Sequence, residues 1–208
     1  SWLHAEEYLA DNPARGIRIA VTKKVPASYT REQLHALLAA AKTREYDFMF
    51  VLLDTGLRLA EITSLRRDSI NWKTGEFIVL GKGRKERKGW LSQPSITALQ
   101  AYLATRTDSH PSLWYGISRP LAPNGAYQAI QRLAESVGLL NTTRRRVHAF
   151  RATFAKHYIQ EGGDLGSLSK LLGHEDVSTT AHYSQLATDE LEAQKRRVNP
   201  LGAILETR

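Results

Sequence analysis

The fold of this chain depends most on residues 148–174, which read HAFRATFAKHYIQEGGDLGSLSKLLGH. From Phe150 an aromatic residue recurs every fourth position for two steps, and this spacing predicts an amphipathic helix over residues 148–161. His148 and Arg151 are three positions apart and would share one face of that helix. Both side chains would therefore point toward one anion.

The second half of this stretch ends in a helix terminus. Residues 164–172 are predicted to be helical, and Gly173 follows them as glycine commonly follows a last helical turn. His174 would then lie on the loop beyond, where rigid scaffolds often display reacting groups. Tyr183 comes nine positions after His174, close enough to return to the same pocket. The spacing permits one site.

The rest of the chain reads as mainly α with a small antiparallel β-sheet, an α+β fold. Thr30 and Gln33 have the spacing of a capping box, which predicts a helix beginning near residue 30. An apolar, β-branched segment at residues 76–80 and a second segment at residues 86–91 flank a glycine-containing loop. This pattern predicts a β-hairpin within residues 76–92. Helices are further expected near residues 30–42, 45–55, 59–67, 94–105 and 123–137.

Five segments stand in a fixed order along the chain. They are Thr55-Gly56-Leu57-Arg58-Leu59-Ala60-Glu61, Gly81-Lys82-Gly83, His148-Ala149-Phe150-Arg151, Leu171-Leu172-Gly173-His174 and Tyr183. Together they resemble the catalytic domain of tyrosine recombinases of the phage-integrase and Xer type, over a match from about Asn12 to the C-terminus. Each segment alone occurs by chance in many chains, whereas five in this order make the resemblance specific. The sequence departs from the family at Ala152, where many members carry His.

The resemblance implies an enzyme that cleaves and rejoins DNA through a tyrosine. Tyr183 would attack the scissile phosphorus to give a 3′-phosphotyrosyl intermediate and a free 5′-hydroxyl, with no ATP or other cofactor. Arg58 and Arg151 would stabilise the charged transition state with donors that stay protonated. His174 would add a hydrogen bond to the same oxygens, and His148 would assist proton transfer.

By the same analogy, a lysine of the hairpin loop would protonate the departing 5′-oxygen. Lys82 is favoured by its position within Gly-Lys-Gly, but Lys85 and Lys88 lie within reach of the same turn, and the sequence leaves the choice open. Glu61 follows Arg58 by three residues on a predicted helix and would hold that guanidinium rather than touch DNA.

The charge of the chain agrees with a double-stranded DNA partner. There are 29 Lys and Arg against 21 Asp and Glu, a formal net charge of +8, which favours salt-dependent attraction to phosphates. The excess clusters beside the predicted catalytic groups. The residues expected to contact the DNA backbone are Arg84, Lys85, Arg87 and Lys88 on the hairpin and Arg144, Arg145 and Arg146 before His148.

Other classes of protein are excluded or disfavoured. The chain has no cysteine, which excludes disulfides, thiolate metal sites and a thiol nucleophile. It has no HExxH, no Walker-type loop and no carboxylate cluster of a two-metal nuclease, so no metal is expected and the catalytic cations should be side chains. No stretch approaches the length of a membrane span, and the first residues lack a signal-peptide pattern. We expect a cytoplasmic enzyme from a bacterial, phage or mobile-element setting.

The domain organisation follows from the same resemblance. Residues 1–11 resemble the tail of a truncated N-terminal core-binding domain, 12–29 a linker, and 30–208 the catalytic domain with a C-terminal helix and tail from 188. In the family such tails dock on a neighbouring protomer, so we expect self-association into a tetramer on paired DNA sites. The apolar residues after Asn199-Pro200 would instead pack on their own domain if they do not dock.

Two other functions remain open at this stage. A type IB topoisomerase would use a similar tyrosine and basic residues to relax supercoils, and a non-catalytic module would only bind DNA. The short spacing from His174 to Tyr183 favours the recombinase over the topoisomerase. The complete set of candidate residues argues against the module, because one replacement at Tyr183 would suffice to end cleavage.

Overall fold

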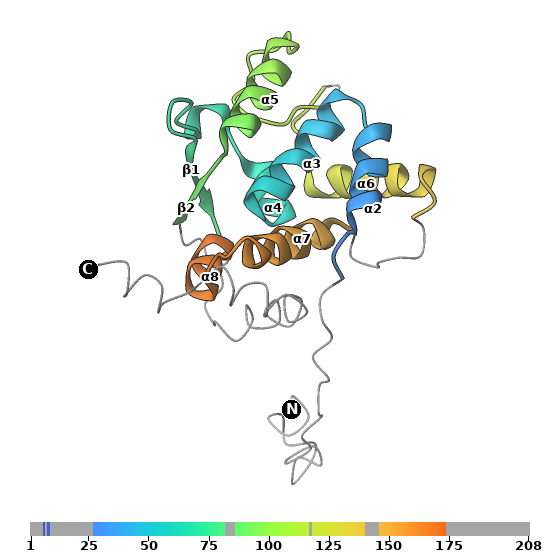
Figure 1. Cartoon of the computed structure of the whole chain (residues 1–208). Helices are drawn as coiled ribbons and strands as arrows, with labels where there is room; N and C mark the ends of the chain where they lie inside the picture. Colours follow the sequence, from blue (N-terminus) through green and yellow to red (C-terminus); the bar gives the residue numbers. More distant parts are fainter. Residues whose placement is uncertain are drawn as a thin grey trace, which may run out of the picture.

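The computed structural model describes residues 6, 8, 27–81, 86–116, 118–139 and 146–173, with only the backbone of Arg146. Within these ranges the chain is mainly helical with a two-stranded antiparallel sheet, which confirms the predicted fold class (Figure 1). The elements are α2 (Arg31–Ala40), α3 (Thr43–Thr55), α4 (Leu59–Ser64), η1 (Arg67–Ser69), β1 (Glu76–Leu80), β2 (Glu86–Trp90), α5 (Gln93–Ala104), α6 (Pro123–Ser136), α7 (Arg146–Gln160) and α8 (Leu165–Leu172). Residues 1–11 apart from Glu6 and Tyr8, the linker up to residue 26 and everything after residue 173 lie outside the described residues.

Local sequence signals account for most helix ends. Thr30 caps α2 by accepting a hydrogen bond from the Gln33 backbone N–H at 3.3 Å, and the Gln33 side chain accepts from the Thr30 N–H at 3.0 Å. This is the predicted capping box. Gly173 ends α8 in the left-handed conformation with φ of 63°, also as the sequence predicted.

One predicted helix is shorter than expected. The run predicted as helical over residues 59–67 leaves the α-helix at Leu65, and residues 67–69 form a separate 3-10 turn. The reason is a long-range pairing, because the Leu65 carbonyl accepts a hydrogen bond from the Leu113 N–H at 2.8 Å and Arg66 forms a β-bridge with Ser112. A distant segment therefore overrides the local helical preference.

Helices α3 and α7 organise the core. Phe48, Met49 and Leu52 of α3 are almost fully buried, and the Phe48 ring packs edge-on against Trp114 with 5.0 Å between ring centroids. Helix α7 is buried on two sides, because Phe150 joins this main core whereas Ala152 belongs to a second cluster shared with α8. In Figure 1, α7 runs below α3 and α4, and α8 lies at its left-hand end.

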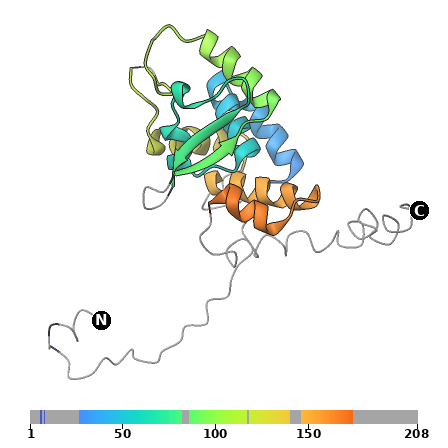
Figure 2. The same cartoon turned by 90° about the vertical axis from the view of Figure 1, so that its left-hand side faces the viewer.

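The hairpin has an inner and an outer face. Its register pairs Phe77 with Gly89 and Val79 with Arg87, and all four residues are buried or half-buried. The alternate residues, including Lys88, are exposed or half-buried on the other face. Figure 2 shows the hairpin directly above α8, so β2 is available to contact the end of that helix.

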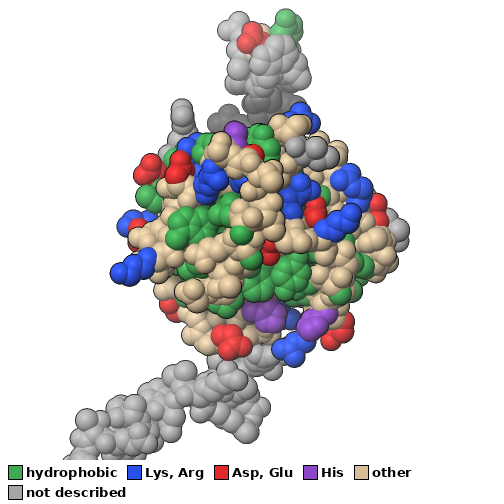
Figure 3. Space-filling model, turned by 90° about the horizontal axis from the view of Figure 1, so that it is seen from above, with side chains coloured by type: hydrophobic (Ala, Val, Ile, Leu, Met, Phe, Trp, Pro, Cys, Tyr) green, Lys and Arg blue, Asp and Glu red, His purple; other side chains and the backbone are tan. Residues whose placement is uncertain are grey.

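The surface away from α8 carries mixed charge. Figure 3, which views the molecule from above, shows Lys and Arg side chains interspersed with Asp and Glu and with exposed hydrophobic groups. This face does not concentrate the positive charge of the sequence. Among the described residues, no helix has both the length and the apolar character needed to span a membrane.

Candidate functional site

The turn between α3 and α4 sets the position of Arg58. Gly56 ends α3 with φ of 60°, and a Cβ at that position would lie 2.4 Å from the Phe154 ring, so glycine is required for conformation and for space. Arg58 then precedes α4 as its N-cap with extended backbone, φ −70° and ψ 153°. The helix expected near residues 59–67 thus begins at Leu59, directly after Arg58. The Glu61 carboxylate accepts the Arg58 backbone N–H at 2.8 Å and so caps this helix end.

Glu61 binds two guanidinium groups. Its Oε1 accepts a hydrogen bond from Arg58 Nη1 at 2.9 Å, which is the contact predicted from the sequence, and its Oε2 accepts from Arg87 Nη2 at 2.7 Å. The Glu61 side chain is only 3% exposed. Burial raises the pKa of this carboxyl, but the hydrogen bonds from Arg87 and from the Arg58 backbone outweigh burial, and the pKa lies below its ordinary value. Glu61 is therefore ionised at neutral pH.

The end of α8 is the second anchor of the cluster. The Leu172 carbonyl accepts hydrogen bonds from Arg58 Nη1 at 3.3 Å and from Arg151 Nη2 at 2.6 Å, and the Gly173 carbonyl accepts from Arg58 Nη2 at 3.2 Å. Arg87 Nη1 donates to the Leu171 carbonyl. Carbonyls at a helix C-terminus carry partial negative charge and lack helical partners, so three arginines satisfy them here. The cluster lies directly before His174 in the chain.

Arg151 joins the ends of two helices. Its Nη1 donates to the Gly56 carbonyl at 2.8 Å while Nη2 holds Leu172, so the C-termini of α3 and α8 are bound to one side chain. Arg151 is 1% exposed, although it follows His148 by one turn and His148 is exposed. The neighbouring Ala152 is fully buried against α8, so the departure from the family pattern falls at a packing position.

The three arginines differ in their accessibility. The Arg58 side chain is 35% exposed, that of Arg87 is 12% exposed, and Arg151 is almost completely covered. Arg58 is thus the member of this cluster that a DNA phosphate could reach without any movement of the protein.

The structure assembles part of the predicted site. Arg58, Glu61 and Arg151 come together from segments far apart in the sequence, and His148 lies one turn before Arg151 on α7. Lys88 points outward and forms a salt bridge with Glu76 at 2.7 Å, with 60% of its side chain exposed. The residues that lie outside the described part are Lys82, Arg84, Lys85, Arg144, Arg145, His174, Tyr183 and the side chain of Arg146.

Arg87 is the residue that the sequence analysis placed differently. It was expected to contact DNA from a solvated hairpin, and the structure turns its side chain inward to Glu61 and α8. The register of the hairpin explains the inward position, because Arg87 pairs with the buried Val79 whereas Lys88 pairs with the exposed Ile78.

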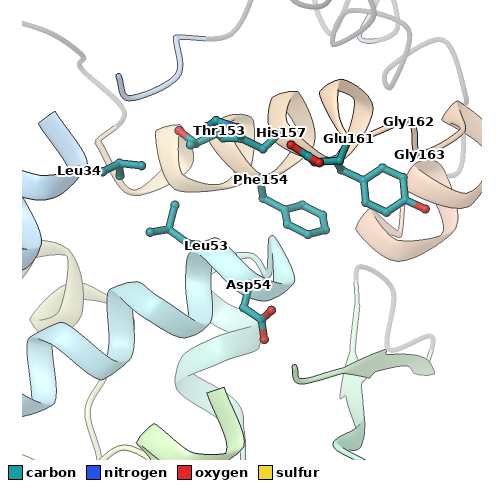
Figure 4. Close-up of a pocket in the computed structure, with 10 residues that line it drawn as sticks. Leu34, Leu53, Asp54, Thr153, Phe154, His157, Glu161, Gly162 and Gly163 are labelled. Carbon is teal, nitrogen blue, oxygen red and sulfur yellow. The ribbon is translucent and has the colours of Figure 1, made fainter. Parts of the chain in front are cut away.

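A separate pocket lies between α2, α3 and α7. It has a volume of about 680 Å³ and is bordered by Leu34, Leu53 and several residues of α7, among them Phe154, whose ring points toward α3 (Figure 4). None of the predicted site residues lines it. Within the described ranges, no group of three or more His, Asp or Glu residues is placed to hold a metal ion.

Comparison with known proteins identifies a family and relatives for this chain. The model of the phage integrase family matches residues 28–190. The tyrosine recombinase XerC of Alcanivorax borkumensis is 33% identical over 89% of this chain, and the match covers 64% of that protein. The chain therefore spans less than two thirds of the length of this relative.

Solved structures show the same fold. The crystal structure of XerA recombinase superimposes with a TM-score of 0.72 at 25% identity, covering 90% of this chain and 71% of that one. The XerH site-specific recombinase bound to its palindromic difH substrate, in a post-cleavage complex, gives a TM-score of 0.70 at 22% identity over 86% of this chain and 56% of that one. Because the family model covers most of the chain, including the segments that supply Arg58, Glu61 and Arg151 to one cluster, this chain belongs to the phage integrase family.

Proposed function

We propose that this chain is the catalytic part of a site-specific DNA recombinase that cleaves and rejoins double-stranded DNA through Tyr183. The observation that carries the proposal is the position of Arg58, which Glu61 and the end of α8 hold together at a partly exposed place directly before His174. The similarity to XerC, a tyrosine recombinase, supports recombination over topoisomerase-like relaxation or passive binding.

The proposed chemistry is two successive transesterifications. The Tyr183 oxygen would attack phosphorus, the bond from phosphorus to the 5′-oxygen would break, and the reverse attack by a 5′-hydroxyl would release the tyrosine. Arg58 would donate to the non-bridging oxygens as they gather charge, because its guanidinium remains protonated and part of it is exposed. Lys82 would give the departing 5′-oxygen its proton.

Arg151 would act in two ways in this proposal. It holds the ends of α3 and α8, and it would add charge to the transition state. Direct contact between Arg151 and the phosphate requires the groups that now cover it to move aside, since a side chain that is 1% exposed cannot reach DNA where it lies. His174 and His148 would supply the hydrogen bond and the proton transfer expected from the sequence.

The same proposal extends to the partners of the whole protein. The XerH recombinase was solved as a complex with its palindromic difH substrate, and we propose double-stranded DNA as the partner here. We also propose a tetramer on paired sites, with residues 199–208 contributing to assembly. Deleting these residues should weaken assembly on DNA, as seen by sedimentation, while circular dichroism stays unchanged. Unchanged assembly would refute this part of the proposal.

A covalent adduct provides the direct test. The chain is incubated with supercoiled plasmid without metal or ATP, quenched in denaturant and digested, and mass spectrometry then locates any nucleotide attached to Tyr183. Tyr183→Phe should abolish the adduct and keep DNA affinity. An adduct accompanied by a ladder of relaxed topoisomers and no strand exchange would favour the topoisomerase. If no adduct forms even with a core-binding domain fused before residue 12 and a nicked substrate, binding alone would be the function.

The arginine contribution has its own measurement. Arg58→Ala should lower the rate of adduct formation by at least about 100-fold, the effect of removing one preorganised donor from a charged transition state. Arg66→Ala is the matched control, because Arg66 is an exposed arginine paired with Asp68 away from the cluster. Equal rates for the two variants would remove Arg58 from the mechanism.

A further inference from the structure

Arg87 has no catalytic role in the mechanism above, yet its side chain makes some of the closest contacts in the cluster. Its Nη2 lies 2.7 Å from Glu61 Oε2, its Nε lies 3.5 Å from Oε1, and its Nη1 donates to the Leu171 carbonyl. The Arg87 guanidinium therefore binds the buried Glu61 carboxylate and the end of α8 at the same time. A planar guanidinium with five donors suits this task, whereas an ammonium group does not.

The position of Arg87 connects two parts of the proposed site. It stands on β2, on the strand that follows the loop containing Lys82, and it reaches across to the last turn of α8. A Cβ placed on Gly173 would lie 2.7 Å from the Arg87 Cδ atom, so the two residues are packed against each other without room for a side chain. The hairpin and the residue before His174 are thus held at a fixed separation.

Arg87 also acts on Arg58 through their shared partner. Glu61 Oε1 accepts from Arg58 Nη1 and Oε2 accepts from the Arg58 backbone, so the orientation of this carboxylate sets the orientation of Arg58. Arg87 fixes the carboxylate from the opposite side. Removing Arg87 would leave Glu61 free to rotate with Arg58, and misplacement of a reacting group by about 1 Å can cost about 100-fold in rate.

We propose that Arg87 is a positioning residue, which aligns Arg58 and the end of α8 with the hairpin formed by β1 and β2. In this role Arg87 does not contact the DNA backbone. This inference rests on the proposed function for its effect on rate. The inward position of Arg87 does not depend on that function. Only 12% of the Arg87 side chain is exposed, and its guanidinium donates to Glu61 and Leu171.

The test separates positioning from phosphate contact by salt dependence. Binding of a labelled duplex of about 30 base pairs, long enough to span two to three helical turns, is measured over a range of salt concentrations. The proteins compared are wild type, Arg87→Gln, Arg87→Lys and the control Arg66→Gln. A phosphate contact contributes about one unit to the slope of the logarithm of affinity against the logarithm of salt concentration. We expect the wild-type slope in all variants.

The rate of adduct formation on supercoiled plasmid supplies the second readout. Arg87→Gln should lower the maximal rate by about 10- to 100-fold while the half-saturating plasmid concentration stays within about twofold of wild type. Arg87→Lys should recover part of the rate, because it restores the charge opposite Glu61 but cannot also hold Leu171. Hydrogen exchange in residues 165–173 should be faster in Arg87→Gln, and circular dichroism should show the fold retained.

Each result decides the proposal. A salt slope lowered by about one unit, or unchanged exchange in α8 with an unchanged rate, would overturn it. If Arg87→Gln does not fold, Arg87→Lys decides through hydrogen exchange in residues 165–173 and through the rate of adduct formation, because lysine keeps the charge but cannot also hold Leu171. A wild-type chain that forms no adduct would count against the proposed function alone, because exchange in α8 would still show whether Arg87 holds this segment in place.

Discussion

Two carboxylates are buried to nearly the same extent in this molecule and behave in opposite ways. Glu61 is 3% exposed at the start of α4, and Asp47 is 5% exposed on α3. Two guanidinium groups and a backbone N–H surround Glu61, whereas Asp47 Oδ2 has no hydrogen-bond partner among the described residues. The pKa of Glu61 lies below its ordinary value, and burial raises the pKa of Asp47 to about 6.

This difference between Glu61 and Asp47 shows that, within the described residues, the fold supplies charged partners to only one of the two buried carboxylates. Burial alone disfavours an ionised carboxylate, so Glu61 keeps its charge only because Arg58 and Arg87 are brought to it. Arg58 and Arg87 bind Glu61, and Arg151 donates to the Leu172 carbonyl at the same helix end, so these four side chains together carry a net charge of +2. Hydrophobic packing alone does not require three guanidinium groups and a carboxylate at this place. The excess positive charge is suited to a phosphate.

Glu61→Gln should have the largest effect, because it removes the charge that sets Glu61 apart from Asp47. The amide keeps the shape but leaves Arg58 and Arg87 without a counter-charge, and its NH₂ group would face a guanidinium donor. Breaking a buried ion pair costs about 3 kcal/mol, so the free energy of unfolding in urea should fall by about this amount near neutral pH. Glu161→Gln, at an exposed position, is the control and should change stability by less than about 0.5 kcal/mol.

The pH dependence of this variant gives a second check. Because the pKa of Glu61 is lowered in the folded state, its stabilising effect is fully present above the unfolded pKa of about 4.3 and is lost as pH falls through the folded value. The stability difference between wild type and Glu61→Gln should therefore shrink below about pH 4. A difference that stayed constant down to about pH 3 would mean that Glu61 is not held as an ion.

Gly173→Ala tests the backbone of the arginine cluster. A side chain there would adopt φ of 63° and would bring Cβ to 2.7 Å from Arg87 Cδ, so we expect a loss of about 2 kcal/mol. Gly138→Ala is a matched control, because Gly138 has φ of 74° and nothing within 4 Å of the added Cβ. It should cost only the conformational strain, about 1 kcal/mol. Equal losses in thermal or urea unfolding would show that Gly173 is not tightly packed against Arg87.

Much of the fold could be predicted because the signals are local. The capping pair Thr30 and Gln33 and the terminal Gly173 depend on neighbours within a few residues, and the structure places both as expected. The end of α4 could not be predicted in this way. Leu65 leaves the helix because its carbonyl pairs with Leu113, and nothing in the sequence near residue 65 encodes that partner.

The candidate site was predictable only in part, for a related reason. The spacing of Arg58 and Glu61 is local, and their contact is present. Arg87 lies in the strand ERKGW, where charged residues occupy both faces, so no hydrophobic alternation marks which side is buried. Its role depends on Glu61 and Leu171, which are 26 and 84 residues away. The burial of Arg151 is also a property of the assembled fold.

Asp47→Asn should test the same contrast at Asp47, whose Oδ2 has no hydrogen-bond partner among the described residues. Between the unfolded pKa of about 3.9 and the folded value of about 6, the native state binds more protons than the unfolded state, so wild-type stability falls as pH rises and levels off above about pH 6. The asparagine has no such slope and should be more stable than wild type by about 1–2 kcal/mol near neutral pH. Urea unfolding at several values between about pH 4 and pH 7.5 measures both. A loss of stability near neutral pH would show that Asp47 has a favourable partner when charged.

The smallest stability change is expected at Lys88, the sequence neighbour of Arg87. Lys88 pairs with Glu76 on the outer face of the hairpin, and both side chains are well exposed, so Lys88→Gln should change the free energy of unfolding by less than about 0.5 kcal/mol. Its DNA binding should change instead, because an exposed lysine that contacts a phosphate contributes about one unit to the salt slope. Of these two adjacent residues of β2, Arg87 would then serve the structure of the arginine cluster, and Lys88 would contact DNA. A large loss of stability without a change in slope would mean that the outer face of the hairpin serves the fold rather than DNA.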